Sequence, residues 1–302
     1  MEKRRIIIIF ALIIGILLLG SVIYYASPSK SASNEGKISL IVTVPPQAEF
    51  AEKIGGDKVK VTVMVPPGAN PHTYEPLPEQ LKEVSNAQIY AQVGSGIEFE
   101  NVWMEKINSM NKNIVIINCS NGITFISNNE TSSEHSEGLK NQYDTHVWVS
   151  PKNAKTIVEN IYKTLVQIDP ANRDYYTSNK DKYLKELDNT DKKINESISG
   201  NKNRIIMVYH PSWGYFCRDY GLTQVAIEKN GKEPSPQEIA TLIDIAQKDN
   251  IKIIFISPQF SRKSADMIAS EIGGQVIVID DMDKNYISNL NNVAEAFKKA
   301  LN

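Results

Sequence analysis

The sequence has little of the chemistry that marks several large classes of protein. Only two of its 302 residues are cysteine, and Cys119 and Cys217 are too few and too far apart for a disulfide framework or a cysteine zinc cage. Both lie in apolar or aromatic surroundings, so we expect buried free thiols. The 33 basic and 35 acidic side chains nearly cancel, and no long basic stretch follows the first few residues. This balance argues against nucleic-acid binding.

Long apolar runs are also absent, except at the N-terminus. Three basic side chains, Lys3 to Arg5, precede an almost unbroken apolar run from Ile6 to Tyr25, which predicts export of the following chain. The run exceeds the usual ~7–15-residue core of a signal peptide and approaches the ~20 residues that span a bilayer. Residues 1–26 are therefore a signal peptide or a membrane anchor, and we favour the anchor. Residues 27–37 are small and polar, which predicts a flexible tether to the membrane.

The rest of the chain alternates between strand-like and helix-like segments. Eight runs rich in β-branched residues are expected to be strands, and helical patterns lie between most of them. Such alternation predicts parallel sheets covered by helices, an α/β fold. The predicted strands are Ile38–Val44, Val59–Val65, Gln88–Val93, Ile114–Cys119, Arg204–Tyr209, Leu222–Ile227, Ile251–Ile256 and Gln275–Ile279.

The alternation breaks once, which predicts two lobes. Residues 169–199 contain no glycine and, after Pro170, no further proline, a composition that favours one long rigid helix. We therefore expect an N-terminal α/β lobe at residues 38–168, this connecting helix, and a C-terminal α/β lobe at residues 200–302. Within the first lobe, residues 127–142 are polar and acidic without apolar periodicity, which predicts a mobile surface loop.

Candidate metal ligands are few, because the chain has only four histidines. His72 lies in a proline-rich loop after a predicted strand, and His146 lies just before a predicted helix. His210 and Asp280 each directly follow a predicted strand. Open parallel sheets bind ligands beyond the carboxyl ends of their strands, so facing lobes could bring these residues together. A lone loop histidine is more often a capping or packing residue, and no HExxH, HxH or paired CxxC motif occurs, so spacing alone leaves the question open.

From Ile38 to its end, the chain resembles the metal-binding solute-binding proteins of ABC importers for zinc, manganese and iron. Several segments carry the resemblance, and their combination and order are specific although each alone is weak. They are PPGANPHTYEP with His72, VGSGIEFENVW, DTHVWVSPKNA with His146, IDPANRDYYTSNKDKY, YHPSWGYFCRDYGL with His210, EPSPQEI, and VIVIDDMDKNYISNLNNV with Asp280.

This resemblance implies two lobes joined by one long rigid helix, with a metal ion in the cleft between them. His72 and His146 would bind the ion from the first lobe, and His210 and Asp280 from the second. The implied partner is the membrane permease of an ABC importer. The protein is expected to be an extracytoplasmic monomer that carries a metal ion and catalyses no reaction.

Zn²⁺ is the cargo that this ligand set favours. Three imidazoles and a carboxylate suit a tetrahedral zinc site, whereas Mn²⁺ prefers more oxygen ligands. In the resemblance, manganese and iron members tend to carry a carboxylate where this chain has His210, and Mn²⁺ or Fe²⁺ is the alternative cargo. Asp281 beside Asp280 leaves two candidates for the acidic ligand. His135 stands alone where zinc-specific members often carry a His-rich insertion, and is either a linker residue or a weak accessory ligand.

Two other functions compete with metal delivery. A zinc-dependent hydrolase would keep one metal position open for water and use Asp280 as a general base. The motifs supply no substrate site for such an enzyme, and a metal-bound water with catalytic turnover would be its mark. A surface adhesin on the same fold is neither supported nor excluded by the sequence.

Overall fold

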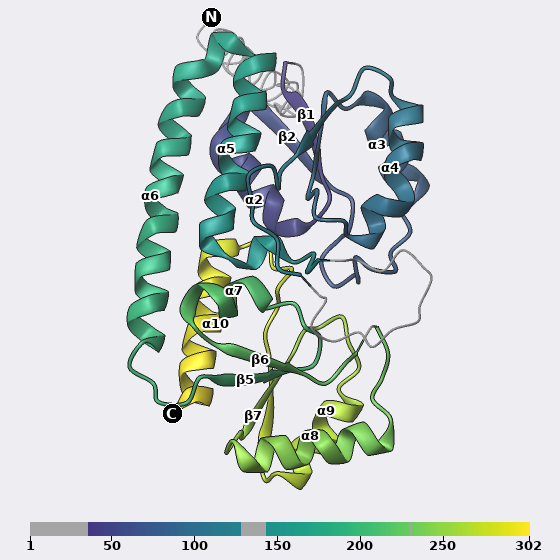
Figure 1. The fold of residues 1–302 in the computed structure, drawn as a ribbon. Helices are drawn as coiled ribbons and strands as arrows, with labels where there is room; N and C mark the ends of the chain where they lie inside the picture. Colours follow the sequence, from purple (N-terminus) through teal and green to yellow (C-terminus); the bar gives the residue numbers. More distant parts are fainter. Residues whose placement is uncertain (1–35, 128–142, 230) are drawn as a thin grey trace, which may run out of the picture. The chain divides into compact units, whose positions relative to one another are not determined.

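The structure, a computed structural model, describes residues 36–127, 143–229 and 231–302. Over these ranges the chain forms an α/β fold of two lobes, each built on a four-stranded parallel sheet (Figure 1). The segment expected to be a signal peptide or anchor, residues 1–26, and the loop around His135 lie outside the described residues. Among the described helices, none has the length and apolar character needed to cross a bilayer.

The first sheet has the strand order β2-β1-β3-β4. β1 (Ile38–Val42) pairs in parallel with β2 (Val59–Val63) on one side and with β3 (Ile89–Gln92) on the other, and β4 (Val115–Asn118) follows β3. β1 is central and largely buried, which its run of Ile, Leu and Val side chains explains, since inner strands of parallel sheets are covered on both faces.

The second sheet repeats this order as β6-β5-β7-β8. Its strands are β5 (Ile205–Val208), β6 (Thr223–Ala226), β7 (Ile253–Ile256) and β8 (Gln275–Val278), again all parallel. Each of the strands in both sheets falls within a range predicted from the sequence. The predicted α/β class is therefore confirmed.

Proline and serine side chains explain where several helices begin. Pro45, Pro78, Pro151 and Pro236 stand at the first helical position, where a missing N–H costs nothing. Ser150 also caps the helix that follows it, accepting a hydrogen bond from the Asn153 N–H at 3.0 Å. The described helices are α2 (Pro45–Gly55), α3 (Pro78–Asn86), α4 (Glu98–Met110), α5 (Pro151–Ile168), α6 (Arg173–Ile198), α7 (Gly214–Tyr220), α8 (Pro236–Lys248), α9 (Lys263–Glu271) and α10 (Tyr286–Leu301), with 3-10 turns η1 (Gly56–Lys58), η2 (Val147–Val149) and η3 (Pro170–Asn172).

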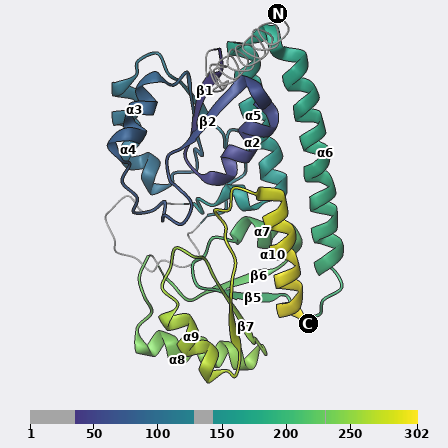
Figure 2. The same cartoon turned by 180° about the vertical axis from the view of Figure 1, so that it is seen from behind.

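A long helix joins the lobes, as the sequence predicted. α6 has 26 residues, packs along α5, α2 and α10, and leads directly to β5 (Figure 2). Hydrogen bonds add to this connection: the indole Nε1 of Trp148 donates to the backbone carbonyl of Asp281 at 2.7 Å, and the Tyr286 hydroxyl donates to the carbonyl of Trp148 at 2.7 Å. One apolar core continues through both lobes, with Phe255 and Phe297 in contact at its second-lobe end, and a separate core lies between the second sheet and helices α8 and α9.

Candidate metal centre

Three of the predicted site residues converge where the loops of the two sheets meet. Nε2 of His146 lies 3.2 Å from Nε2 of His72 and 3.1 Å from Nε2 of His210. Among the described residues, these histidines are the one group of three or more side chains whose ligand atoms all lie within 4.8 Å of one another. Zn–N bonds of about 2.0–2.1 Å in a tetrahedron place nitrogens roughly 3.4 Å apart. The two measured separations are within a few tenths of an ångström of that spacing.

Each histidine is placed by local backbone structure. His72 lies in the loop between β2 and α3, where its N–H donates to Oδ1 of Asn70 at 2.9 Å and tightens the turn. His146 immediately precedes η2, and His210 follows β5 by two residues. The His210 ring also stacks on Phe260, with ring centroids 4.7 Å apart and an interplanar angle of 21°. The two sheets thus supply ligands beyond the carboxyl ends of their strands, as expected for parallel sheets.

A carboxylate holds the other ring nitrogen of each histidine. Nδ1 of His72 lies 2.5 Å from Oε2 of Glu98, and Nδ1 of His146 lies 2.9 Å from Oδ1 of Asp144. Nδ1 of His210 lies 3.2 Å from Oε2 of Glu228. A carboxylate at Nδ1 favours the proton on that nitrogen, so the Nε2 lone pairs face the common centre, as in many zinc sites.

None of these three carboxylates was predicted from the sequence. Asp144 stands only two residues before His146, so its contact could have been proposed from local spacing. Glu98 opens α4 after β3, and Glu228 follows β6 by two residues. Both are acidic side chains beyond the carboxyl end of a strand, and this position was the signal that the sequence offered.

Burial and neighbouring charge act in opposite directions on the histidines. Burial lowers the pKa of His146, but the hydrogen bond and charge of Asp144, together with the charges of Asp281 and Glu98, raise that pKa above its ordinary value. Burial also dominates at His210, where the charges of the other two histidines add to it and lower the pKa despite Glu228. Three carboxylates thus surround three imidazoles, an arrangement that attracts a cation.

The fourth predicted residue, Asp280, lies outside the histidine group. Its Oδ1 accepts hydrogen bonds from Nε2 of Gln259 at 3.1 Å and from the Met282 N–H at 2.9 Å. The neighbouring Asp281 carboxylate accepts a hydrogen bond from the Ser257 hydroxyl at 2.7 Å. Burial raises the pKa of Asp280, since its charge has lost water without gaining a cationic partner.

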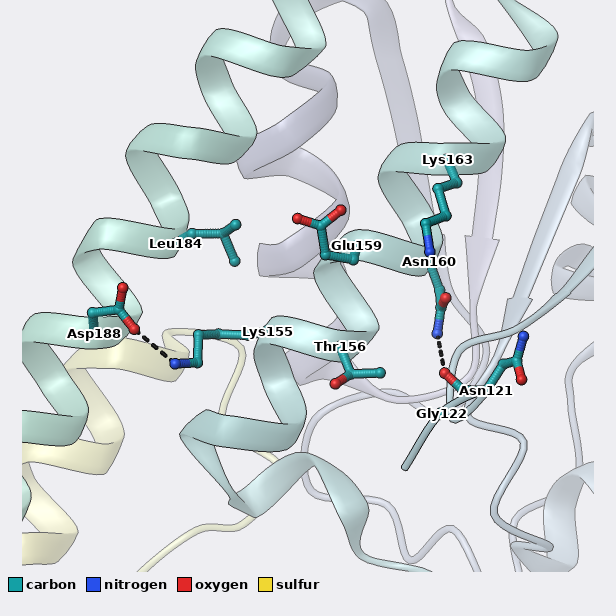
Figure 3. A pocket seen from close by; sticks show the side chains of 9 residues that line it. All are labelled: Asn121, Gly122, Lys155, Thr156, Glu159, Asn160, Lys163, Leu184 and Asp188. Atoms are coloured by element: carbon teal, nitrogen blue, oxygen red, sulfur yellow. Dashed lines mark hydrogen bonds and ion pairs between the residues drawn. The ribbon is translucent and has the colours of Figure 1, made fainter. Parts of the chain in front are cut away.

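A separate groove of about 430 Å³ lies along α5 and α6 (Figure 3). Its lining is mostly polar, and several of the polar groups already have partners within the lining. Nζ of Lys155 lies 2.7 Å from Oδ1 of Asp188, and Nδ2 of Asn160 donates to the carbonyl of Asn121 at 2.9 Å. None of the histidines or their carboxylates lines it. The groove therefore has no part in the histidine site.

Two α/β lobes joined by a long helix, with histidines from both lobes meeting between them, define a metal-binding solute-binding protein. The sequence model of one family, described as ZnuA, zinc-uptake complex component A, periplasmic, matches residues 40–300. The chain belongs to this family. Its members are extracytoplasmic transport components, so the hydrolase is set aside.

Individual relatives agree with this assignment. The high-affinity zinc uptake system protein ZnuA of Bacillus subtilis is 30% identical over 267 residues, which cover 85% of this chain and 83% of that protein. A crystal structure of ZnuA superposes with a TM-score of 0.82 at 39% identity, covering 88% of this chain and 100% of that one. A zinc-bound deletion mutant of ZnuA gives a TM-score of 0.80 at 40% identity, with 88% and 98% covered.

Proposed function

We propose that this protein captures one Zn²⁺ through the Nε2 atoms of His72, His146 and His210 and delivers it to the membrane permease of an ABC importer. The observation that carries the proposal is the meeting of three Nε2 atoms whose rings are each held from behind by a carboxylate. Such an arrangement orients the Nε2 lone pairs towards the metal position before the metal ion binds.

The donor set supports zinc over the other ions considered. Imidazole nitrogen suits Zn²⁺, and a site with three of them offers Mn²⁺ fewer oxygen ligands than it prefers. Fe²⁺ also accepts imidazole and is the nearer competitor. Relatives that are named as zinc uptake proteins support the same choice.

We further propose that Asp280 supplies the acidic ligand. Its partly buried carboxylate has no cationic partner among the contacts described above, and a bound metal ion would supply the missing positive charge. To reach the ion it would exchange the hydrogen bonds from Gln259 and Met282, whereas the Asp281 carboxylate is buried and accepts a hydrogen bond from Ser257. Calorimetry should show a larger loss of zinc affinity for Asp280→Ala than for Asp281→Ala, and the reverse order would assign the role to Asp281.

The N-terminal segment is proposed to hold the protein at the outer side of the membrane. Residues 1–26 would export the chain and remain as an anchor, and residues 27–37 would tether the two lobes to it. Cell fractionation with N-terminal sequencing tests this proposal. A released mature chain beginning near Ala26 would replace the anchor with a cleaved signal peptide.

The cargo is tested by purifying the protein from its native source without added metal and measuring the bound elements. We expect close to one zinc per chain. Close to one manganese or iron per chain would show that Mn²⁺ or Fe²⁺ is the cargo. Calorimetry on the metal-free protein then gives the number of tight sites, and more than one would contradict the single-site proposal.

A further inference from the structure

Helix α7 of the second lobe touches the segment of the first lobe that carries His146. The carboxylate of Asp144 accepts two hydrogen bonds at Oδ1, from the N–H and from Nδ1 of His146, both at 2.9 Å. The hydroxyl of Tyr215 in α7 donates to the backbone carbonyl of Asp144 at 2.8 Å and accepts from the N–H of Ile126 at 3.2 Å. Tyr215 of the second lobe thus connects two backbone segments of the first lobe, at Ile126 and Asp144, beside the ligand His146.

Gly214, the first residue of α7, lies directly against the same carboxylate. A Cβ added to Gly214 would lie 2.3 Å from Oδ2 of Asp144, closer than real atoms approach. The φ of Gly214 lies outside the left-handed region, so its backbone conformation does not require glycine. The space that a side chain would take is the reason for the glycine here: Asp144 occupies it.

The same stretch of chain also carries His210. Only three residues separate His210 from Gly214, and they are fixed by hydrogen bonds: the Ser212 N–H donates to the His210 carbonyl at 2.8 Å, and the Trp213 N–H donates to Oε1 of Gln224 at 2.8 Å. Tyr215 is fully buried and Asp144 nearly so, which leaves neither much freedom to shift. A short rigid segment of the second lobe therefore links a histidine of its own to the support of a histidine in the other lobe.

We propose that Gly214 and Tyr215 are positioning residues for the metal site: they seat Asp144, and Asp144 sets the ring of His146 at its spacing from His210. The inference rests on the proposed function, because it explains how a zinc site made from two lobes keeps one geometry. It adds that the second lobe determines the position of a first-lobe ligand.

The decisive variant is Gly214→Ala in the full metal-free protein, with zinc affinity measured by chelator competition. Zinc affinity should fall about 10- to 100-fold, the range seen when a ligand's supporting partner is disturbed. Alanine forms helix better than glycine, so a weaker α7 cannot explain such a loss. Gly200→Ala is the matched control, since no atom lies within 4 Å of a Cβ there, and its affinity should equal that of wild type.

Tyr215→Phe is the second variant and removes a single oxygen. It should weaken zinc binding less than Gly214→Ala does, because the Asp144 backbone loses one hydrogen bond and the Asp144 carboxylate meets no steric clash. Tyr220→Phe is its control in the same helix: the Tyr220 hydroxyl donates to Oδ1 of Asp191 at 2.7 Å, away from the histidines. If circular dichroism shows that Gly214→Ala does not fold, the test rests on Tyr215→Phe. Wild-type zinc affinity in Tyr215→Phe would then overturn the proposal.

Two further readouts separate positioning from general destabilisation. In an Asp144→Ala background, Gly214→Ala should cost no further zinc affinity, because the residue through which it acts is gone; additive losses would overturn the proposal. In the metal-free protein, the NMR signals of the His146 ring should shift in Gly214→Ala while those of His72 stay in place. Unchanged His146 signals together with wild-type affinity would refute the positioning role.

The proposed function has its own point of failure. Wild-type zinc affinity in His146→Ala would show that zinc does not bind at these histidines. Loss of affinity in His146→Ala with full affinity in Gly214→Ala would leave the site standing and overturn only the role of α7.

Discussion

The two lobes have the same strand order but present their ligands differently. In the second lobe His210 follows β5 by two residues, whereas in the first lobe His72 follows β2 by nine, at the tip of a proline-rich loop. The surroundings differ in the same sense: side-chain exposure is 10% for His210 and 5% for its partner Glu228, against 19% for His72 and 44% for Glu98. Equal topology therefore does not give equal environments: of these two ligands, the one next to its strand is the more buried.

This difference divides the site into a rigid side and an open side. His210 lies between Phe260 and a buried carboxylate, so its ring has little freedom. His72 and Glu98 face solvent more, and an incoming ion would meet them first. The pair on the open side can adjust at small cost because water replaces any contact that is lost, whereas the buried pair cannot.

Removing the imidazole ring of each ligand should have the largest effect on zinc binding. His72→Ala, His146→Ala and His210→Ala should each weaken zinc binding by more than the ~100-fold that marks the upper end for supporting partners, because a direct ligand is lost. Calorimetry or chelator competition measures this loss, with His135→Ala as the control that keeps wild-type affinity. An unchanged affinity in any of the first three would exclude that residue as a ligand.

Acidification should weaken zinc binding next most strongly. An imidazole binds metal only when neutral, so each proton that must be displaced costs about tenfold in affinity per pH unit below the pKa of that histidine. The pKa of His146 is raised and that of His210 is lowered, so the proton of His146 competes with the metal at a higher pH than the proton of His210 does. Zinc affinity measured from pH 7.5 to 5 should fall steeply, and a flat profile would point to carboxylate ligands.

The variant Asp144→Asn tests how protonation of His146 contributes to this pH dependence. Without this carboxylate, the pKa of His146 loses the partner that raises it most, so the fall in affinity should begin at a lower pH than in wild type. The absolute affinity at pH 7.5 should nevertheless be weaker, since the ring has lost the partner that orients it. An unshifted onset would mean that protonation of His146 does not determine the pH at which zinc affinity begins to fall.

The supporting carboxylates should rank by burial. Glu228→Gln should reduce zinc affinity towards the ~100-fold end of the range for such partners, and Glu98→Gln towards the ~10-fold end. Both variants keep the shape of the side chain and remove the charge, so they are matched to each other. Equal losses would show that exposure does not distinguish the two sides of the site.

The smallest expected effect is a change in the distance between the lobes. α6 contains no proline or glycine at which a helix usually kinks, and Trp148 and Tyr286 add hydrogen bonds to the interface. Spin labels on the two lobes should report a shift of only ~1–2 Å when zinc binds, the scale of helix adjustments. A change of many ångströms would show hinge closure and contradict the rigid connection.

Residue patterns predicted the fold well because its signals are local. Each strand is a short β-branched run ended by a turn, and α6 is a long stretch without helix breakers, so neither depends on distant contacts. The convergence of His72, His146 and His210 followed from motifs taken together, since spacing alone left it open.

The parts that sequence did not predict depend on side-chain contacts across the fold. Glu98 reaches His72 only because α4 and the loop after β2 lie side by side, and Glu228 reaches His210 only because β5 and β6 are neighbours. The hydrogen bond from Gln259 to Asp280 likewise joins loops that follow different strands. Such pairings are set by the rotation of helices and the course of loops, which periodicity does not specify.

The continuous apolar core has a consequence for how this molecule can change over time. Side chains from α5, α6, α10 and both sheets belong to one cluster, whereas the face of the second sheet that α8 and α9 cover has a separate core. A lobe taken from a relative would meet foreign surfaces along the shared core, and each misfit would cost stability as overpacking or cavities do. Substitutions on the two sides of the molecule are therefore expected to accumulate in matched pairs, and the ligand-bearing loops at the surface are the parts free to diverge.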